Sequence, residues 1–270
     1  MSSYLITGAS RGLGFQFLRE LAGNPENTVI GLVRNKAAAE AKVKEEGLVG
    51  VHIVEAQYTD LASLKQAAEA VKEITGGGLD YLVHNAAIVS QLTEYKTLGD
   101  FDDDFETLEK DLRESLDVNL IGYIKAVQAF IPLIRNGKDK KVIALSSGVA
   151  DIDLINSIDL AFAAPYSISK GALNVAVAKY SALYKEQGIL FIAISPGFVM
   201  TERNTIAPSP EDAGKDGILV GKFSKYAPHF TRPLTPEESV AAVLSVSQNA
   251  SIAKGDGGAF ISHLGNKQWL

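Results

Sequence analysis

Short apolar runs alternate with longer amphipathic stretches along almost the whole chain. The apolar runs, rich in Val, Ile and Leu, predict strands over residues 4–6, 28–33, 51–55, 79–84, 141–145, 190–194 and 259–262. The stretches between them have helical periodicity and predict helices over residues 12–22, 36–46, 61–74, 108–134, 166–187 and 236–249. Strands that are apolar on both faces and alternate with helices are typical of a parallel sheet covered on both sides. The pattern therefore predicts an α/β fold.

The segment from Glu202 to Leu234 does not fit this alternation. It is rich in Pro and Gly and only weakly patterned. A long irregular stretch inside a compact domain is usually a lid or a binding loop. We therefore expect residues 202–234 to form a lid.

Composition excludes several classes of function. The chain has 270 residues, of which 46% are apolar, and its net charge of −6 argues against a nucleic-acid partner. It has no cysteine, which excludes disulfides, thiolate catalysis and cysteine metal sites. The acidic run at residues 100–104 is interpreted as a solvated helix start, so no metal site is predicted.

The chain shows no signal for export or membrane insertion. The first apolar strand begins at Tyr4, which leaves no room for a signal peptide. No apolar run approaches the roughly eighteen residues of a membrane span. We expect a soluble, cytoplasmic protein with no membrane partner.

The first strand runs directly into a turn that contains Gly8, Gly12 and Gly14 and opens a helix. In this setting the backbone N–H groups and the helix N-terminus form an anion site, and pyrophosphate is the usual ligand. Gly8 permits the tight turn, Gly12 lets phosphates approach the backbone, and Gly14 lets the helix pack on the sheet. The spacing predicts a dinucleotide site, and an ordinary strand–helix turn is the alternative.

The end of the second strand indicates which dinucleotide is bound. A domain that prefers NAD places an acidic residue there, but this strand ends in Gly31-Leu32-Val33-Arg34-Asn35. Arg34 can bind a 2′-phosphate with its planar guanidinium group, and Arg11 lies in the turn beside the same ribose. Either arginine alone could be a surface charge, but the two together predict NADP(H).

Tyr166 and Lys170 are four residues apart, which places them on one face of a helix. A tyrosine is a poor acid or base at neutral pH, but a nearby positive charge favours the phenolate and lowers the pKa. Such a pair is a plausible general acid for a carbonyl that is reduced, or a base for an alcohol that is oxidised.

With these residues the chain resembles the short-chain dehydrogenase/reductase family, from Thr7 to Gly265. The motifs that carry the resemblance occur in the family's order: Thr7-Gly8-x3-Gly12-x-Gly14, Asp60, Asn85-Ala86-Ala87, Asn119, Ser147, Tyr166-x3-Lys170, and Pro196-Gly197 with Thr201. The arginines resemble the NADPH-preferring branch, and the ending with Phe260, Gly265 and Trp269 resembles its small carbonyl reductases. The resemblance implies a single Rossmann-type doubly wound domain over residues 1–270, with a seven-stranded parallel sheet flanked by helices.

The resemblance also implies four catalytic residues. Tyr166 would be the proton donor, and Lys170 would hold the nicotinamide ribose hydroxyls and lower the pKa of Tyr166. Ser147 would donate a hydrogen bond to the substrate oxygen, where negative charge develops. Asn119 would hold a water that links Lys170 to bulk solvent as a proton relay. The implied activity is NADPH-dependent reduction of a ketone or aldehyde to an alcohol.

Further residues are implied to contact the cofactor. Asp60 would meet the adenine amino group, and Asn85 with Ala86 would line the adenosine side. Thr201 would bind the nicotinamide amide. The predicted cofactor set is Gly8, Ser10, Arg11, Gly12, Leu13, Gly14, Arg34, Asp60, Asn85, Ala86, Tyr166, Lys170, Pro196, Gly197, Val199 and Thr201.

The chain departs from the family pattern in two places. The usual Asn-Asn-Ala-Gly begins with His84, which ends a strand and is interpreted as structural rather than catalytic. The distance from Ser147 to Tyr166 is several residues longer than usual, and we expect residues 148–165 to form a loop that shapes the substrate pocket. Ser146 competes with Ser147 for the catalytic role, and the family pattern favours Ser147.

Charge and hydropathy also suggest the substrate. No lysine or arginine occurs between Val142 and Ser169, which favours a neutral, largely apolar carbonyl. The lid does carry cations, which are interpreted as solvated: Arg203, Lys215, Lys222, Lys225 and Arg232.

The helix over residues 108–134 resembles one that builds a dimer face in relatives, so a homodimer is a possible assembly. Two rival functions stay open. One is a non-catalytic protein that senses NADP(H) or acts as a scaffold, and the other is an NADP-dependent alcohol dehydrogenase working in the oxidative direction.

Overall fold

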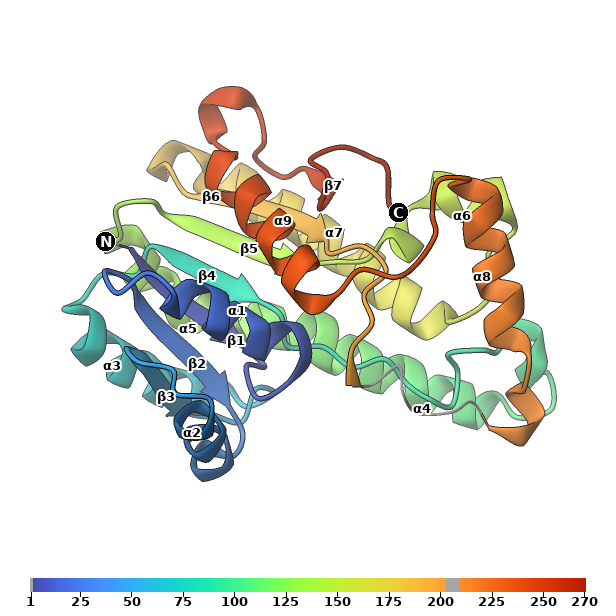
Figure 1. The fold of residues 1–270 in the computed structure, drawn as a ribbon, viewed down its shortest axis with the longest axis horizontal. Helices are drawn as coiled ribbons and strands as arrows, with labels where there is room; N and C mark the ends of the chain where they lie inside the picture. The colour runs from blue at the N-terminus through green and yellow to red at the C-terminus, as the bar shows by residue number, and fades with distance from the viewer. Residues whose placement is uncertain (1, 203–208) are drawn as a thin grey trace.

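A computed structural model describes residues 2–202 and 209–270 of the chain. In this part, one sheet holds seven parallel strands in the order β3-β2-β1-β4-β5-β6-β7, with helices on both faces (Figure 1). The strands are β1 (Ser3–Thr7), β2 (Thr28–Val33), β3 (Val51–Glu55), β4 (Tyr81–His84), β5 (Lys141–Leu145), β6 (Leu190–Ser195) and β7 (Phe260–Ser262). The strand order reverses between β1 and β4, as in doubly wound folds, which confirms the predicted Rossmann-type architecture.

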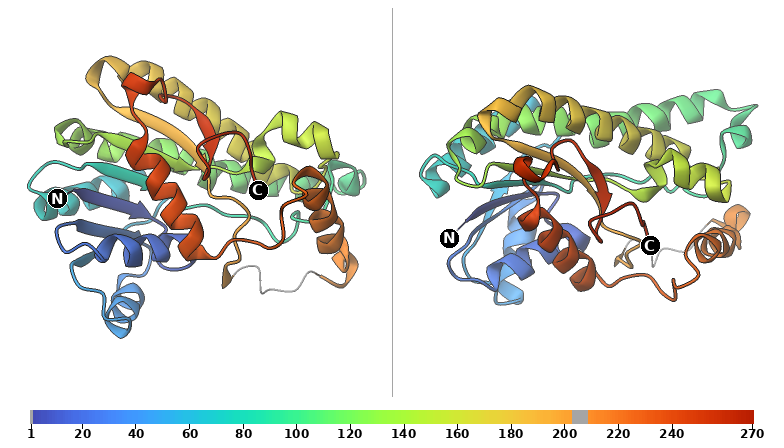
Figure 2. Two further views of the ribbon diagram at one scale, coloured as in Figure 1. Left: turned by 45° about the horizontal axis from the view of Figure 1, so that its top comes forward. Right: turned by 90° about the horizontal axis from the view of Figure 1, so that it is seen from above.

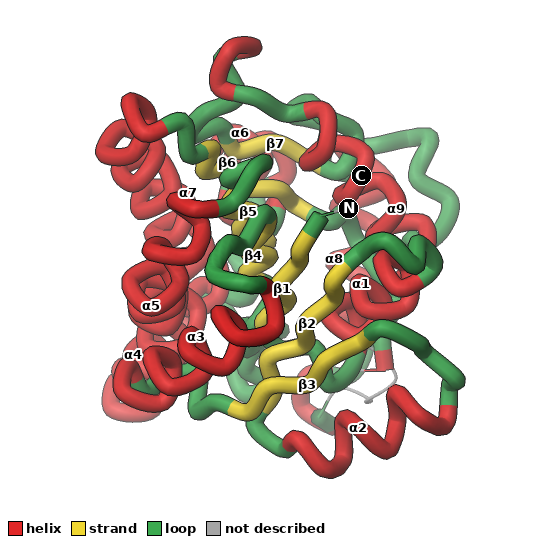
Figure 3. The backbone as a smooth tube through the Cα atoms, turned by 90° about the vertical axis from the view of Figure 1, so that its left-hand side faces the viewer, coloured by secondary structure: helices red, strands yellow, loops and turns green. Residues whose placement is uncertain are grey.

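The helices form one layer on each face of the sheet (Figure 3). One layer holds α1 (Gly12–Ala22), α2 (Lys36–Glu45) and α9 (Pro236–Asn249). The other layer holds α3 (Leu61–Thr75), α4 (Phe105–Leu116), α5 (Gly122–Asn136) and α7 (Ala164–Tyr184). Alternation along the strands supplies apolar side chains to both layers, since successive residues point to opposite faces.

The strand β4 illustrates how this alternation positions a polar residue. Leu82 is fully buried in the core cluster that includes Phe130 of α5. Two residues further on, His84 therefore faces the same layer, and its ring lies 4.9 Å from the ring of Tyr123 on α5. Tyr81 and Val83 point to the opposite face and pack in a separate core cluster that includes Phe17 of α1.

The predicted helix over 108–134 is two helices joined by a π-helical turn. The turn, η2 (Asp117–Ile121), separates α4 from α5, and the N–H of Gly122 donates to the carbonyl of Asp117. By length and composition the combined helix Phe105–Asn136 could cross a membrane, which the sequence expectation missed. However, 56% of its apolar window is buried inside the protein, as expected for a core helix. Single π turns often occur at functional sites, and this one contains the buried Asn119.

Residues 148–165 are not irregular throughout, because α6 (Ile152–Ile158) lies within them, and their role in shaping the substrate pocket stays a prediction. The Asp151 carboxylate accepts a hydrogen bond from the N–H of Leu154 at 2.9 Å and caps the helix. Leu154 and Ile158, one turn apart, are buried in a cluster with Trp269. The helix therefore depends on a partner that lies far along the chain.

Residues 202–234 are likewise not irregular throughout, because α8 (Lys215–Tyr226) occupies part of them, and their role as a lid stays a prediction. Phe223 anchors α8 in the cluster with α6, and Lys222 Nζ donates to the carbonyls of Ile158 and Asp159 at 2.8 and 2.9 Å. The two helices stand together at the end of the molecule towards which the strands point (Figures 1 and 2). Arg203 and the rest of 203–208 lie outside the described residues.

Candidate active site

The glycine turn between β1 and α1 is packed so closely that side chains are excluded. Gly8 has φ +67°, and a Cβ there would lie 2.9 Å from Cα of Ala86. A Cβ at Gly14 would lie 2.3 Å from the Gly8 carbonyl oxygen. Both glycines are therefore required by the close approach of α1, the turn and the segment after β4.

Thr7 and Asn85 fasten this turn to the end of β4. The Asn85 side-chain amide donates to the carbonyls of Thr7 and Gly8 at 3.0 and 3.1 Å. The Thr7 hydroxyl accepts the backbone N–H groups of Asn85 and Ala86 at 3.1 and 3.0 Å. Asn85 thus holds the turn in place.

A cleft of about 360 Å³ runs along the carboxyl ends of β1, β2 and β4. In doubly wound sheets, ligands bind in this place, at the reversal of strand order. The structure brings the following predicted cofactor residues together in its lining: Gly8, Ser10, Arg11, Gly12, Leu13, Arg34, Asn85, Ala86 and Thr201.

Asp60 is not among the residues that line this cleft. Its carboxylate accepts the N–H of Ala62 at 2.9 Å and caps α3. Gln57, Tyr58 and Thr59, which lie between β3 and this cap, line the cleft instead. The position directly after β3 could have indicated them from the sequence, because the carboxyl ends of parallel strands share one edge.

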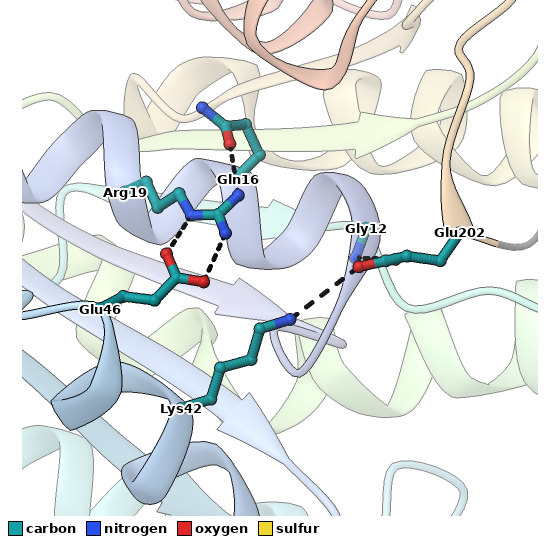
Figure 4. A network of polar contacts seen from close by, with 6 residues as sticks. All are labelled: Gly12, Gln16, Arg19, Lys42, Glu46 and Glu202. Carbon is teal, nitrogen blue, oxygen red and sulfur yellow. Dashed lines mark hydrogen bonds and ion pairs between the residues drawn. The ribbon is translucent and has the colours of Figure 1, made fainter.

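The glycine turn binds an anionic group from a distant segment. Glu202 Oε2 accepts the N–H of Gly12 at 3.0 Å, and Lys42 Nζ lies 3.9 Å from its other oxygen (Figure 4). Gly12 opens α1, where backbone N–H groups and the helix dipole favour negative charge. The carboxylate occupies the kind of position that a pyrophosphate oxygen takes in such turns. The turn therefore fits a dinucleotide phosphate.

The two arginines of the cleft are exposed. Neither Arg11 nor Arg34 forms an ion pair with another residue in 2–202 or 209–270. By contrast, Arg19 on the outer side of α1 pairs with Glu46 and also donates to Gln16 (Figure 4). Arg11 and Arg34 are therefore the guanidinium groups of this cleft that can bind a further phosphate.

The Tyr–Lys pair lies on α7. Lys170 is 2% exposed, and its Nζ donates to the carbonyl of Leu145 at 2.7 Å. Burial lowers the pKa of Lys170 to about 7, because an ammonium group loses its hydration inside the protein. Lys170 Nζ lies 5.8 Å from the ring centroid of Tyr166, which is partly exposed. A proton can thus be held or released beside Tyr166 near neutral pH.

The Asn119 side chain links the π-helical turn to two neighbouring segments. Its Oδ1 accepts the N–H of Ile88 at 2.8 Å, and its Nδ2 donates to the Ile88 carbonyl and to Ser169 Oγ at 3.0 and 2.9 Å. Ser169 Oγ in turn donates to the carbonyl of Tyr166 at 2.7 Å. Both amide hydrogens of Asn119 are thereby used. A water held by Asn119 would therefore donate to an oxygen of Asn119, either Oδ1 or the backbone carbonyl.

Two adjacent serines follow β5, and they differ in exposure. Ser146 is 2% exposed, and its hydroxyl has no hydrogen-bond partner among the described residues. Ser147 is partly exposed and begins the short turn at Gly148–Ala150. The accessible hydroxyl is therefore that of Ser147.

The C-terminal segment packs directly behind Ser147. A Cβ on Gly148 would lie 2.8 Å from Cβ of Trp269. The Trp269 ring stacks on Phe260 with centroids 4.5 Å apart. The surroundings of Ser147 are therefore apolar on this side, and the turn after β5, β7 and the C-terminal segment build them together.

The segment after β6 reaches the cleft at Thr201 and Glu202. Gly197 has φ +84°, and a Cβ there would approach the His263 ring to 2.9 Å. The Pro196 carbonyl accepts Ser239 Oγ at 2.7 Å, and Val199 forms a bridge with Leu234. These three predicted residues shape the backbone that carries Thr201 into the cleft lining.

A doubly wound fold with a glycine-lined cleft and an adjoining Tyr–Lys pair defines a dinucleotide-dependent class of protein. The family model described as "short chain dehydrogenase" matches residues 3–211, and the chain belongs to this family. The predicted family is thus confirmed, and with it the oxidoreductase class.

Fungal relatives match along the whole chain. The short chain dehydrogenase virK of Hypocrea virens is 48% identical over 272 residues, and the short-chain dehydrogenase/reductase AacuF of Aspergillus aculeatus is 49% identical over 271 residues. In both cases all of this chain and all of the relative are covered.

Solved structures give the same result. The NADPH-bound carbonyl reductase from chicken fatty liver matches with a TM-score of 0.75, 29% identity and 98% coverage of both chains. The carbonyl reductase Sniffer of D. melanogaster has the same TM-score at 20% identity and supports the fold alone.

Proposed function

We infer that the protein is an NADPH-dependent reductase that converts a ketone or aldehyde of a neutral, largely apolar small molecule to an alcohol. The observation that carries this proposal is Lys170, a buried cation with a pKa of about 7 whose Nζ lies 5.8 Å from the Tyr166 ring. A buried, strongly perturbed group beside a cleft is typical of a functional site.

The cleft and its surroundings offer residues that suit each part of the cofactor. The N–H of Gly12 suits the pyrophosphate, since it already binds a carboxylate. Arg11 and Arg34 suit a 2′-phosphate, because their exposed guanidinium groups line the same cleft. Gln57 replaces Asp60 as the residue for the adenine. The family resemblance assigns the nicotinamide ribose to Lys170 and the nicotinamide amide to Thr201.

When bound, NADPH supplies a hydride to the carbonyl carbon. Tyr166 donates its phenolic proton to the carbonyl oxygen, and Ser147 donates a hydrogen bond to the same oxygen as negative charge develops. Lys170 then returns a proton to the phenolate. Asn119 holds Tyr166 and Lys170 in register, because its amide binds Ser169, which binds the backbone of Tyr166.

Three lid cations are already engaged, which favours an uncharged substrate. Lys215 pairs with Asp212 at 2.9 Å, Lys222 binds the end of α6, and Arg232 pairs with Glu238 at 2.6 Å. Beside the lid, Leu154, Ile158 and Trp269 form a buried apolar cluster, which also suits an apolar substrate. The three lid cations are therefore already engaged and are not available to an anionic substrate.

The oxidative direction uses the same residues, since each proton step is reversible, and cofactor ratios would set the direction.

We place the enzyme in the cytoplasm. A homodimer through the long helix Phe105–Asn136 and α7 is a further proposal, because Ile121 at the π-helical turn and Val175 and Leu183 on α7 are 38%, 60% and 62% exposed. Light scattering at the mass of one chain would contradict the dimer.

Turnover with a set of carbonyl compounds tests the function. We expect the purified protein to consume NADPH with neutral aldehydes, ketones or quinones at least about tenfold faster than with acidic carbonyls or acyl thioesters. NADH should be the poorer cofactor. Tight NADPH binding without turnover on any carbonyl would favour the non-catalytic sensor, and failure to bind NADPH would overturn the proposal.

A further inference from the structure

His84 is a buried titratable residue beside the catalytic groups that the proposed reaction does not use. It is 0% exposed, and its register partner on β5 is Ala144, the residue before Leu145, whose carbonyl binds Lys170. His84 Nε2 has no hydrogen-bond partner in the described part of the chain. A buried polar atom without a partner is uncommon and requires an explanation.

A directed chain of hydrogen bonds determines which ring nitrogen carries the proton. Burial raises the pKa of Tyr58 well above its ordinary value, so the phenol keeps its hydrogen and needs an acceptor for it. Tyr58 Oη contacts His84 Nδ1 and has no other acceptor among residues 2–202 and 209–270. Tyr58 therefore donates to Nδ1, and His84 is neutral with its proton on Nε2.

The surroundings of His84 show where this Nε2–H group lies. The His84 ring contacts Tyr123, which follows Asn119 by about one turn of the same long helix, and its strand partner Ala144 precedes Leu145, whose carbonyl binds Lys170. The ring therefore lies near both the π-helical turn and Lys170. Burial lowers the pKa of His84 well below its ordinary value, so the ring is neutral. The rings of Tyr58 and Tyr123 both lie near it, with centroids at 5.7 and 4.9 Å.

Resting on the proposed function, we propose that the Nε2–H of His84 donates a hydrogen bond to a buried water shared with the Asn119 backbone carbonyl and Lys170 Nζ. His84 is then a positioning residue for the water that returns a proton to Lys170. In this step a proton passes from solvent through the water to the neutral Lys170 amine and restores the ammonium group. His84 keeps its own proton throughout, so no bond within the ring changes.

The tautomer can be measured without any turnover. The chain has four histidines, and long-range proton–nitrogen NMR spectra distinguish Nδ1–H from Nε2–H rings. The signal lost in His84→Asn identifies His84. We expect a neutral Nε2–H ring from about pH 5 to 8, with a nuclear Overhauser contact from Nε2–H to water. A Nδ1–H ring, a ring that titrates in this range, or no contact to water would overturn the proposal.

Kinetics test the link to Lys170. Tyr58→Phe removes the donor to Nδ1 and keeps the ring, so Nε2 becomes free to accept a hydrogen bond from the ammonium group. We expect kcat for reduction to fall about three- to tenfold, and the alkaline limb of its pH profile to move to higher pH by about half a unit or more. NADPH affinity is measured in parallel, because Tyr58 also lines the cofactor cleft.

Tyr123→Phe is the matched control. Its ring also lies against His84, but its hydroxyl has no partner in the described chain. We expect the tautomer and the pH profile of Tyr123→Phe to equal those of the wild type. A Tyr58→Phe profile that coincides with that of Tyr123→Phe would overturn the proposal. If the wild type reduces no carbonyl, the proposed function fails, and the NMR result still decides the tautomer and the water.

Discussion

Buried polar groups have different numbers of hydrogen-bond partners at the two ends of the parallel strands, here called the amino edge and the carboxyl edge of the sheet. At the amino edge, Asp80 accepts hydrogen bonds from the N–H and hydroxyl of Ser3 and from the N–H of Lys138, at 2.6 to 2.9 Å. Lys141 Nζ donates there to the carbonyls of Ser247 and Gln248 at the end of α9. Both of these charges have several hydrogen-bond partners.

At the carboxyl edge, buried polar groups have fewer hydrogen-bond partners. Within the described chain, Lys170 makes one hydrogen bond, to the Leu145 carbonyl, and no ion pair. His84 Nε2 and Ser146 Oγ have no partner there. Unsaturated buried groups destabilise a fold, so their concentration at one edge indicates function, whereas the amino edge serves stability.

The largest expected effect comes from Lys170→Met. The carbonyl reduction rate should fall by about 10²- to 10⁴-fold, since the proton supply to Tyr166 is lost. Lys179→Met, on the exposed side of the same helix, is the control and should leave the rate unchanged.

The same variant should be more stable than the wild type, by about 1–3 kcal/mol at or below pH 7. The folded pKa of Lys170, about 7, is below the ordinary value of 10.5, so burial of the ammonium group costs stability at low pH. This cost is relieved as pH rises from about 7 to about 10, and the gain of Lys170→Met should shrink over that range. Chemical denaturation at several pH values measures it, and a gain that grows with pH would contradict the assignment.

Asp80→Ala tests whether the amino edge serves stability and not activity. We expect a loss of about 2–4 kcal/mol in the free energy of unfolding, because Ser3 and Lys138 lose a shared acceptor. Burial raises the pKa of Asp80, but these hydrogen bonds outweigh it and the pKa is lowered, so its contribution exists above about pH 4 and fades as pH falls further. Activity per folded molecule should not change. Asp139→Ala, at an exposed neighbouring site, should cost less than about 1 kcal/mol.

Local patterns predicted most of this fold, since the helices α1 and α9 and the strands β2, β3 and β5 each follow from their own residues. The helices α6 and α8 could not be predicted this way. Gly217 and Gly221 weaken the helical pattern of α8, and Lys222 secures it through Ile158, which lies 64 residues away.

The site residues also differ in whether local sequence patterns predict them. Tyr166 and Lys170 are visible in the sequence as a pair one helical turn apart. The choice between Asp60 and Gln57 depends on which residue after β3 faces the cleft, and no local pattern decides that. Tyr58 meets His84 across 26 residues, so the hydrogen bond that fixes the histidine tautomer is equally invisible locally.

Arg34→Ala tests cofactor choice at the carboxyl edge. NADPH should bind about 10- to 100-fold more weakly, while NADH affinity stays unchanged, because only the 2′-phosphate loses a charged partner. Calorimetric titration with both cofactors measures this. Arg113→Ala, a surface arginine paired with Glu109 on α4, is the control. An equal loss for both cofactors would remove Arg34 from the role.

Glu202→Gln should have the smallest effect. The Glu202 carboxylate and a cofactor phosphate compete for the Gly12 N–H, so removal of its charge should tighten NADPH binding about two- to fivefold, and less at high salt. Glu186→Gln, in the exposed turn after α7, should have no effect. Weaker binding in Glu202→Gln would mean that the carboxylate assists the cofactor.

Tyr166→Phe, compared with Tyr184→Phe on the same helix, tests the central claim most directly. Both variants lose one phenolic hydroxyl and keep the ring. With the best carbonyl substrate and saturating NADPH, we predict that Tyr166→Phe loses about 10³-fold in kcat and still binds NADPH, whereas Tyr184→Phe keeps wild-type activity. Equal activity of the two variants would show that Tyr166 is not the proton donor, and the proposed reaction at this site would be wrong.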